Sequence, residues 1–146
     1  MAATRQARAT WNGDLAKGSG EVSALSSGKF KALPVSWGAR TEAPQGQTSP
    51  EELLAAAHAT CFSMALSGGL AKKGTPPEHL EVTASVTFDK IGESWTVVSS
   101  DLEVKGKVPG LDLEGFRQAA EAAKDGCPIS RALRGNVALT VKPALA

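Results

Sequence analysis

The feature that most constrains this fold is a strong helix-start signal at Ser49, which opens a long run free of helix breakers. Ser49 is suited to the N-cap and Pro50 to the first helical position, where the missing N–H of proline costs nothing. Glu52, three residues after the cap, completes a capping box. We expect the helix to run to about Ala71 and to end before the glycine and prolines of residues 74–77.

Small residues dominate this predicted helix. Leu54, Ala57, Cys61 and Ala65 recur at spacings of three and four, which is typical of one helical face directed at the core. Alanine and serine residues flank them, so another backbone can approach the helix closely. Polar side chains interrupt the apolar run of residues 53–70, and we expect that run to fall short of a membrane span.

Short strands are predicted before the helix. Residues 21–25 and 29–33 are expected to pair as a hairpin across residues 26–28. Residues 34–40 are expected to form an edge strand, since proline is tolerated at a strand's first residue. A loop rich in proline, glycine and polar residues then leads to Ser49.

Three strands and two helices are predicted after the long helix. Alternating apolar and polar residues predict three strands, at residues 80–88, 95–105 and 137–141. Asp112 is suited to cap a helix over residues 113–124, and Cys127-Pro128 to open a short helix that ends near Gly135. Because the chain has few β–α–β units, this order predicts an α+β fold in a single domain, residues 1–146.

The composition is that of a globular chain, with 42% hydrophobic and 21% charged residues. The 16 basic and 15 acidic residues leave a net charge of +1. We expect no nucleic-acid partner, because the chain has neither a basic stretch nor an aromatic cluster for stacking bases. The N-terminal residues lack the apolar core of a signal peptide, and we expect a cytoplasmic protein with no membrane partner.

The chain has only two cysteines, Cys61 and Cys127. In the cytoplasm a cysteine is either a small buried hydrophobic residue or a reactive group. Cys127 precedes a proline at a helix start, where free N–H groups and the helix dipole would favour its thiolate. Cys61 lies in the middle of a helix, where no dipole helps it. The residues alone therefore leave open a redox pair, or a core cysteine and a helix cap without chemical roles.

Metal and cofactor sites are not predicted. His58, one turn before Cys61, could suggest a Cys–His dyad or a metal ligand, but zinc takes three or four ligands. Two cysteines and two histidines without paired spacings do not supply them. We also find no glycine motif that would hold a phosphate, so no nicotinamide or flavin cofactor is expected. The three tryptophans are expected in the core or as walls of an apolar pocket.

Two motifs carry a resemblance to a known family. The run SPEELLAAAHATCFSMALSGGLAKKG resembles the first cysteine motif of the OsmC/Ohr family (osmotically inducible protein C and organic hydroperoxide resistance proteins), and GCPISRAL resembles its second. The histidine before the first cysteine is similar to that of the OsmC branch. The resemblance implies an OsmC-like α+β fold, with antiparallel sheets around a long central helix, in an intertwined homodimer.

The resemblance also implies a function. Cys61 would be the peroxidatic cysteine of a thiol peroxidase that reduces organic hydroperoxides, and hydrogen peroxide less well. Cys127 would be the resolving cysteine, which forms a disulfide with the Cys61 sulfenic acid. No cofactor is implied, and the reductant would be a dithiol, for example of the lipoyl type. In such a dimer we expect His58 to pack or hydrogen-bond at the subunit interface.

By position, the family's arginine and glutamate beside the peroxidatic thiolate correspond to Arg40 and Glu51. The guanidinium would stabilise the Cys61 thiolate and orient the peroxide, while the carboxylate fixes the arginine. Without the resemblance, Arg40 is an exposed charge at a strand end, and Glu51 an acid in the first turn of a helix. Since Cys61 gains nothing from a helix dipole, its activation has to come from such tertiary neighbours.

Helix geometry places a condition on this site. Glu51 and Cys61 are ten residues apart on one predicted helix, which is ~15 Å along the axis at about 1.5 Å per residue. A carboxylate does not span that distance. Either the first turn bends back, or Glu51 comes from a partner chain, and the dimeric family favours a site shared between subunits.

Two other functions remain open. A redox-sensing or ligand-binding dimer would form the disulfide slowly without consuming peroxide catalytically. A general thiol–disulfide oxidoreductase is less well supported, because the chain has no C-x-x-C motif.

Overall fold

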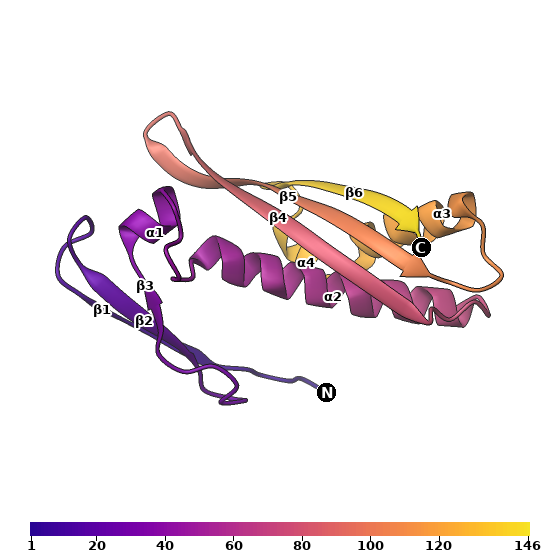
Figure 1. The fold of residues 1–146 in the computed structure, drawn as a ribbon, viewed down its shortest axis with the longest axis horizontal. Helices are drawn as coiled ribbons and strands as arrows, with labels where there is room; N and C mark the ends of the chain where they lie inside the picture. Colours follow the sequence, from indigo (N-terminus) through magenta and orange to yellow (C-terminus); the bar gives the residue numbers. More distant parts are fainter. The chain divides into compact units, whose positions relative to one another are not determined.

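The computed structural model describes residues 1–146, which form six strands and four helices (Figure 1). The chain divides into two compact units, Met1–Leu53 and Leu54–Ala146. Each has its own three-stranded sheet. The expected α+β class is confirmed, and the single domain over residues 1–146 stays a prediction.

The first unit is a small antiparallel sheet followed by a short helix. Its strands are β1 (Ala7–Asn12), β2 (Ser19–Ala24) and β3 (Leu33–Val35), in the order β1-β2-β3. The short turn expected over residues 26–28 is wrong, but the expected antiparallel pairing is present with a later second strand, since β2 pairs with β3 and Val22 lies opposite Leu33. Ala32 has a φ of 53°, a left-handed conformation that breaks the extended run just before β3.

The edge strand expected over residues 34–40 is also wrong. The chain leaves β3 at Val35, and Ser36 caps helix α1 (Trp37–Thr41) by accepting a hydrogen bond of 3.2 Å from the Ala39 N–H. A serine N-cap offers the backbone a helical continuation at this point. Arg40 therefore lies in the last turn of α1 rather than at a strand end.

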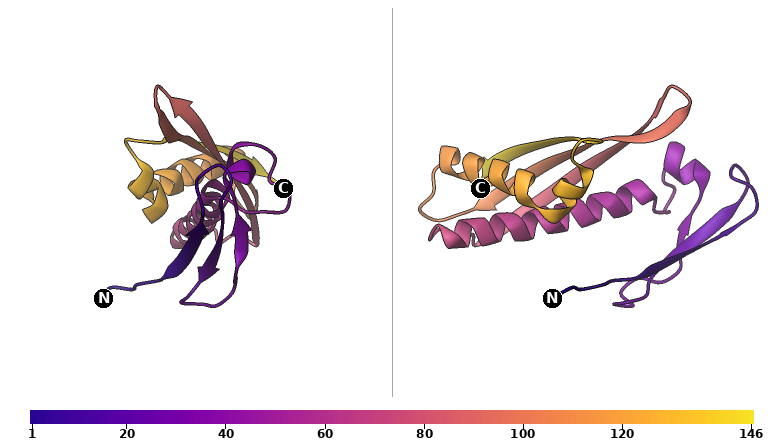
Figure 2. Two further views of the ribbon diagram at one scale, coloured as in Figure 1. Left: turned by 90° about the vertical axis from the view of Figure 1, so that its left-hand side faces the viewer. Right: turned by 180° about the vertical axis from the view of Figure 1, so that it is seen from behind.

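The second unit contains most of helix α2 (Pro50–Lys72) and a mixed sheet. Its strands are β4 (His79–Ile91), β5 (Ser94–Lys107) and β6 (Ala138–Leu145). β4 and β5 form an antiparallel hairpin, but β6 pairs with β5 in parallel, so the expectation of purely antiparallel sheets is wrong. The chain crosses from β5 to β6 through α3 (Leu113–Gly126) and α4 (Pro128–Leu133), which Figure 2 shows beside the sheet.

The predicted helix starts are confirmed. The Glu52 N–H donates to Ser49 Oγ at 3.1 Å, and α2 ends at Lys72. The Glu52 carboxylate accepts from Thr48 Oγ1 at 2.7 Å rather than from the Ser49 N–H, so only the Ser49 half of the predicted capping box forms. Asp112 caps α3 by accepting from the Gly115 N–H at 2.8 Å.

The core of the second unit forms where α2, β5 and α3 meet. One side chain in every four along α2 is buried, and these residues are His58, Phe62, Leu66 and Leu70. The predicted stripe is offset from this one: Ala57 is exposed, and Cys61 lies partly buried beside the core. Alanines occur on every side of α2, so residue size did not identify its buried face.

By length and composition α2 could cross a membrane, with a mean hydropathy of 1.4. This differs from the expectation that the run is too polar for a span. Within the structure 22% of this apolar stretch is buried, and its buried side chains make core contacts. Phe62 is fully buried against the sheet and α3, and His58 is fully buried between two serine hydroxyls.

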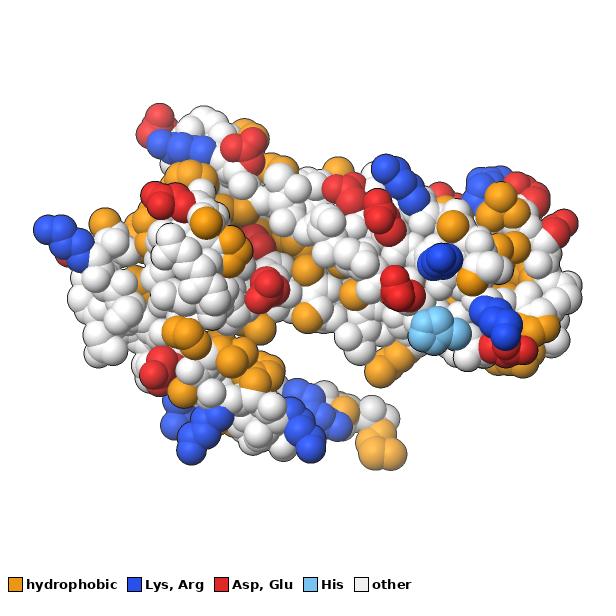
Figure 3. Space-filling model, in the orientation of Figure 1, with side chains coloured by type: hydrophobic (Ala, Val, Ile, Leu, Met, Phe, Trp, Pro, Cys, Tyr) orange, Lys and Arg blue, Asp and Glu red, His pale blue; other side chains and the backbone are white.

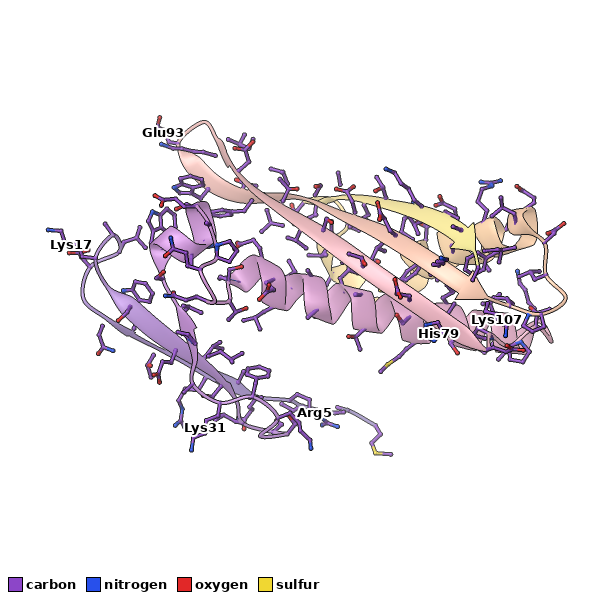
Figure 4. The ribbon with its side chains drawn as sticks, in the orientation of Figure 1. Arg5, Lys17, Lys31, His79, Glu93 and Lys107 are labelled. Carbon is purple, nitrogen blue, oxygen red and sulfur yellow. The ribbon has the colours of Figure 1, made fainter.

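Charged side chains of both signs intermingle along the β4–β5 face (Figure 3). Lys107 at the end of β5 pairs with Glu78 at 2.6 Å, and Lys90 approaches Glu93 in the β4–β5 turn to 4.0 Å. His79 lies near Lys107, as Figure 4 shows, and is exposed.

Candidate active site

Cys127 lies at the junction of two helices. It is the C-cap of α3, where its N–H donates to the Ala123 carbonyl at 2.9 Å, and the N-cap of α4. Its sulfur accepts a hydrogen bond of 3.3 Å from the Ser130 N–H. The side chain is fully buried. The predicted helix start at Cys127-Pro128 is thus confirmed.

Cys61 on α2 is in direct contact with Cys127. The Cys127 thiol and the Ile129 N–H at the start of α4 both lie close enough to the Cys61 sulfur to change its pKa. Both cysteines are free thiols. Cys61 is partly exposed whereas Cys127 is not, so a small molecule reaches Cys61 first. The fold therefore brings together two cysteines that are far apart in the sequence.

The surroundings of Cys61 raise the pKa of its thiol above the ordinary value. Burial is the largest cause, and the hydrogen bond and charge of Cys127 act in the same direction. The hydrogen bond from the Ile129 N–H acts against them. Within Leu54–Ala146, none of these influences is a cation. A cation that lowers the pKa of the Cys61 thiol would therefore have to come from outside Leu54–Ala146.

A buried chain of hydrogen bonds lies behind Cys127. His58 Nδ1 is 2.6 Å from Ser100 Oγ, and His58 Nε2 is 2.8 Å from Ser130 Oγ. Ser130 Oγ is in turn 3.3 Å from Cys127 Sγ. The expectation that His58 packs in a subunit interface is wrong, because its ring is fully buried among residues of its own chain. Burial lowers the pKa of His58, so its ring is neutral at pH 7.

Sequence reasoning missed both serines of this chain. Ser130 had a local signal, since it is the third residue after the Cys127 cap, where an N–H meets the capping side chain. Ser100 had none, because it reaches His58 only through the packing of β5 against α2.

Arg40 and Glu51 form a close ion pair in the first unit. Arg40 Nε lies 3.1 Å from both carboxylate oxygens of Glu51, and one terminal nitrogen donates to Oε1 at 2.8 Å. The guanidinium carbon is 5.8 Å from the centre of the Trp37 ring, within range of a cation–π contact. Glu51 is 8% exposed, so the guanidinium is held in one orientation.

An apolar cavity of about 310 Å³ adjoins Arg40. It lies within the first unit and is lined by Trp11, Leu15, Val35, Ser36, Trp37, Arg40 and Pro50. The tryptophans fit the expectation that some of these rings line an apolar pocket. A Cβ on Gly20 would lie 2.7 Å from the Trp11 ring, so glycine at this position lets the ring lie across β2.

The four predicted site residues thus form two pairs. Arg40 and Glu51 belong to Met1–Leu53, and Cys61 and Cys127 to Leu54–Ala146. The predicted contact between Arg40 and Cys61 stays a prediction. No group of three or more His, Cys, Asp or Glu side chains is arranged to hold a metal ion.

Comparison with known proteins agrees with these motifs. A family model described as "OsmC-like protein" matches residues 43–142. The chain belongs to the OsmC-like family. It is 38% identical to peroxiredoxin OsmC of Escherichia coli (strain K12) over 139 residues, which cover 95% of this chain and 96% of that protein.

Other OsmC-like relatives share both sequence and fold. The organic hydroperoxide resistance protein of Xanthomonas axonopodis pv. citri is 33% identical over 95 residues, covering 64% of this chain and 65% of that protein. The crystal structure of OhrB of Bacillus subtilis, an organic hydroperoxide resistance protein, matches with a TM-score of 0.74 and 26% identity, covering 95% of this chain and 98% of that one. The expected OsmC-like fold is confirmed, and the names support a hydroperoxide-related, peroxidase-type activity at the level of the family.

Proposed function

We propose that this OsmC-like chain is a cytoplasmic thiol peroxidase that reduces organic hydroperoxides at Cys61 and forms a disulfide with Cys127. The observation that carries the proposal is the direct contact of the two free thiols, the partly exposed Cys61 and the buried Cys127. The relative named peroxiredoxin OsmC supports it over 95% of the chain.

The chemistry follows from the two thiols. The Cys61 thiolate attacks the distal peroxide oxygen, the O–O bond breaks, and the alkoxide takes a proton to leave as an alcohol. Cys61 is then a sulfenic acid. The Cys127 sulfur attacks the Cys61 sulfur, and hydroxide takes a proton to leave as water. A dithiol, for example of the lipoyl type, reduces the resulting disulfide and is itself oxidised.

The Arg40–Glu51 pair would supply the cation that Cys61 lacks. Because its carboxylate holds the guanidinium with three hydrogen bonds, the arginine and the glutamate act as one unit. Helix α2 is continuous from Pro50 to Lys72, so its first turn does not bend back. Glu51 thus lies ~15 Å along the axis from the Cys61 of its own helix. We infer that a homodimer brings the pair from one subunit to the Cys61 of the other.

The exposed face of α2 supports a homodimer. Met64 is 70% exposed, and a groove of about 360 Å³ runs beside it along Gly68, Gly69 and the alanines of α3. Small residues let a second backbone approach closely. A partner subunit would remove this apolar surface from water, which favours association.

The cavity beside Arg40 is suited to the alkyl group of a hydroperoxide. Its tryptophan, leucine and valine walls would take up apolar surface, while Arg40 faces the leaving oxygen, on which negative charge develops as the O–O bond breaks. We expect kcat/KM for cumene hydroperoxide to exceed that for hydrogen peroxide by about tenfold or more, because buried apolar area adds binding energy.

Peroxide consumption with a lipoyl-type dithiol as reductant tests both the function and this preference. Leu15→Asn, which puts an amide into the cavity wall, should lower the rate with cumene hydroperoxide more than the rate with hydrogen peroxide. Equal rates for the two peroxides would remove the alkyl site. A disulfide that forms without turnover would favour the redox-sensing alternative.

Arg40→Ala is expected to raise the Cys61 thiol pKa further and to move the pH–rate profile for peroxide reduction to higher pH. The thiolate fraction falls as the pKa rises, so the rate at neutral pH drops about tenfold when the pKa rises by about one. Arg40→Lys should restore only part of the rate, because an ammonium lacks the planar pair of donors.

The ultraviolet absorbance of the thiolate against pH reports this change directly. Arg8→Ala on the exposed strand β1 removes a similar charge from the same unit and serves as the matched control. A titration curve for Arg40→Ala that coincides with the control would mean that another group stabilises the thiolate.

A further inference from the structure

The sulfur of Cys127 is surrounded by hydrogen-bond donors. It accepts from the Ser130 N–H at 3.3 Å, and Ser130 Oγ lies at the same distance. The contact with Cys61 adds a neighbouring thiol. Because Cys127 is fully buried, a thiolate there would have no water to solvate it, so hydrogen bonds from these groups would be needed to stabilise it.

Which way the Ser130 hydroxyl points depends on His58. A neutral imidazole has one donor nitrogen and one acceptor nitrogen. If Nε2 carries the proton, the ring donates to Ser130 Oγ, and the single Ser130 hydrogen is directed to Cys127. If Nδ1 carries it, the Ser130 hydrogen is drawn to Nε2, and Cys127 has to donate its own S–H to Ser130.

We propose that His58 and Ser130 position the hydrogen bonds of Cys127, so that its sulfur acts as the acceptor and is ready to attack the Cys61 sulfenic acid. Ser100 completes this arrangement, since its Oγ lies 2.6 Å from Nδ1 and its hydroxyl donates to Nδ1 when the proton is on Nε2. The inference rests on the proposed function for the attack itself, while the arrangement around Cys127 stands on geometry.

The step balances without an external base. The Cys127 sulfur forms the S–S bond as the S–O bond of the Cys61 sulfenic acid breaks, and the Cys127 proton leaves with hydroxide as water. In the Nε2–H arrangement Ser130 donates to the sulfur, so the thiol proton is free to face the leaving oxygen. On reduction, when the dithiol attacks the Cys61 sulfur, Cys127 departs as a thiolate that the same two donors of Ser130 stabilise.

Charged groups near this chain of hydrogen bonds have other partners. On α3, Lys124 pairs with Glu121 at 2.8 Å. Arg134, just after α4, donates to the Asp125 carbonyl. On β5, Asp101 accepts from Ser99 and Thr140. Arg131 of α4 is exposed. Cys61 and His58, both on α2, are therefore the titratable groups that bear on Cys127.

Single-turnover kinetics test the proposal. One equivalent of hydroperoxide is mixed with the reduced protein, and formation of the sulfenic acid and of the disulfide is followed separately. Ser130→Ala, which keeps the N–H and removes the hydroxyl, should lower the ratio of disulfide rate to sulfenic acid rate by about tenfold or more, because the hydroxyl no longer directs the thiol proton to the leaving oxygen.

Two substitutions of His58 separate positioning from packing. The amide nitrogen of His58→Gln reaches the place of Nε2 and still donates to Ser130, so this variant should keep the disulfide rate within about threefold. The amide of His58→Asn reaches only as far as Nδ1 and Ser100, so it should be as slow as Ser130→Ala. The proposal would be overturned if His58→Asn and His58→Gln formed the disulfide at equal rates and Ser130→Ala kept the wild-type ratio of disulfide rate to sulfenic acid rate.

A second measurement does not depend on peroxidase activity. In Cys61→Ser protein, the remaining thiolate absorbance comes from Cys127, and adding Ser130→Ala should move the absorbance curve to higher pH. This readout holds even if no hydroperoxide reacts, in which case the proposed function fails and the positioning role survives. A curve unmoved by Ser130→Ala would reject the role of the hydroxyl, whatever the peroxide assay shows.

Discussion

Cys61→Ser is expected to abolish hydroperoxide reduction, whereas Cys127→Ser should complete one stoichiometric turnover and stop at a Cys61 sulfenic acid. The reason is the different exposure of the two thiols, since Cys61 is partly open and Cys127 is fully buried. A peroxide therefore meets the Cys61 sulfur, and Cys127 is positioned to resolve the product through its contact with Cys61.

A dimedone-type trap followed by mass spectrometry distinguishes the two roles. The trap should label Cys61 in Cys127→Ser and label neither variant before peroxide is added. Ser63→Ala, elsewhere on α2, is a matched control for substitution within the helix, since its hydroxyl bonds only the Ala59 carbonyl among the described contacts. Label on Cys127 in an active Cys61→Ser protein would reverse the assignment.

Much of the fold could be predicted because its signals are local. The caps at Ser49, Asp112 and Cys127 each rest on a side chain bonding an N–H three residues on, and all three are present. The long alternating strands after the main helix are likewise present as β4 and β5. Capping and alternation are written within a few residues, so one sequence suffices to find them.

The errors came from features without a local signal. The left-handed Ala32 delays the start of β3, yet alanine carries no sign of that conformation. The parallel pairing of β6 is decided by the crossover through α3 and α4. On α2 the small residues hid which face is buried, so His58 was expected at an interface rather than in the core.

The candidate site shows the same division. The two cysteines and the Arg40–Glu51 pair were found through motifs, and the structure shows that each pair is in contact. Ser100 and Ser130 were not found, because their link to His58 joins three elements that are far apart in the sequence. The motif suggested a cation beside Cys61, but no cation is among the groups that influence the Cys61 thiol, whose pKa is raised.

Mixing two inactive variants, Cys61→Ser and Glu51→Ala, is expected to restore hydroperoxide reduction. In a heterodimer, the Cys61 of the Glu51→Ala chain meets the intact Arg40–Glu51 pair of the Cys61→Ser chain, which gives one complete site. The other site lacks both groups. Random exchange makes half of the dimers heterodimers with one working site in two, so activity should recover to about a quarter of the wild-type value per subunit.

The physical basis is the length of α2. The helix is continuous, and ten residues separate Glu51 from Cys61 along it, which is about 15 Å. The carboxylate therefore serves the Cys61 of another chain or no Cys61 at all. Mixing Cys61→Ser with Cys61→Ser,Glu51→Ala is the matched control and should stay inactive, because neither chain brings a Cys61. Absence of recovery after subunit exchange has been demonstrated by mass, or full activity in a monomer, would defeat the shared site.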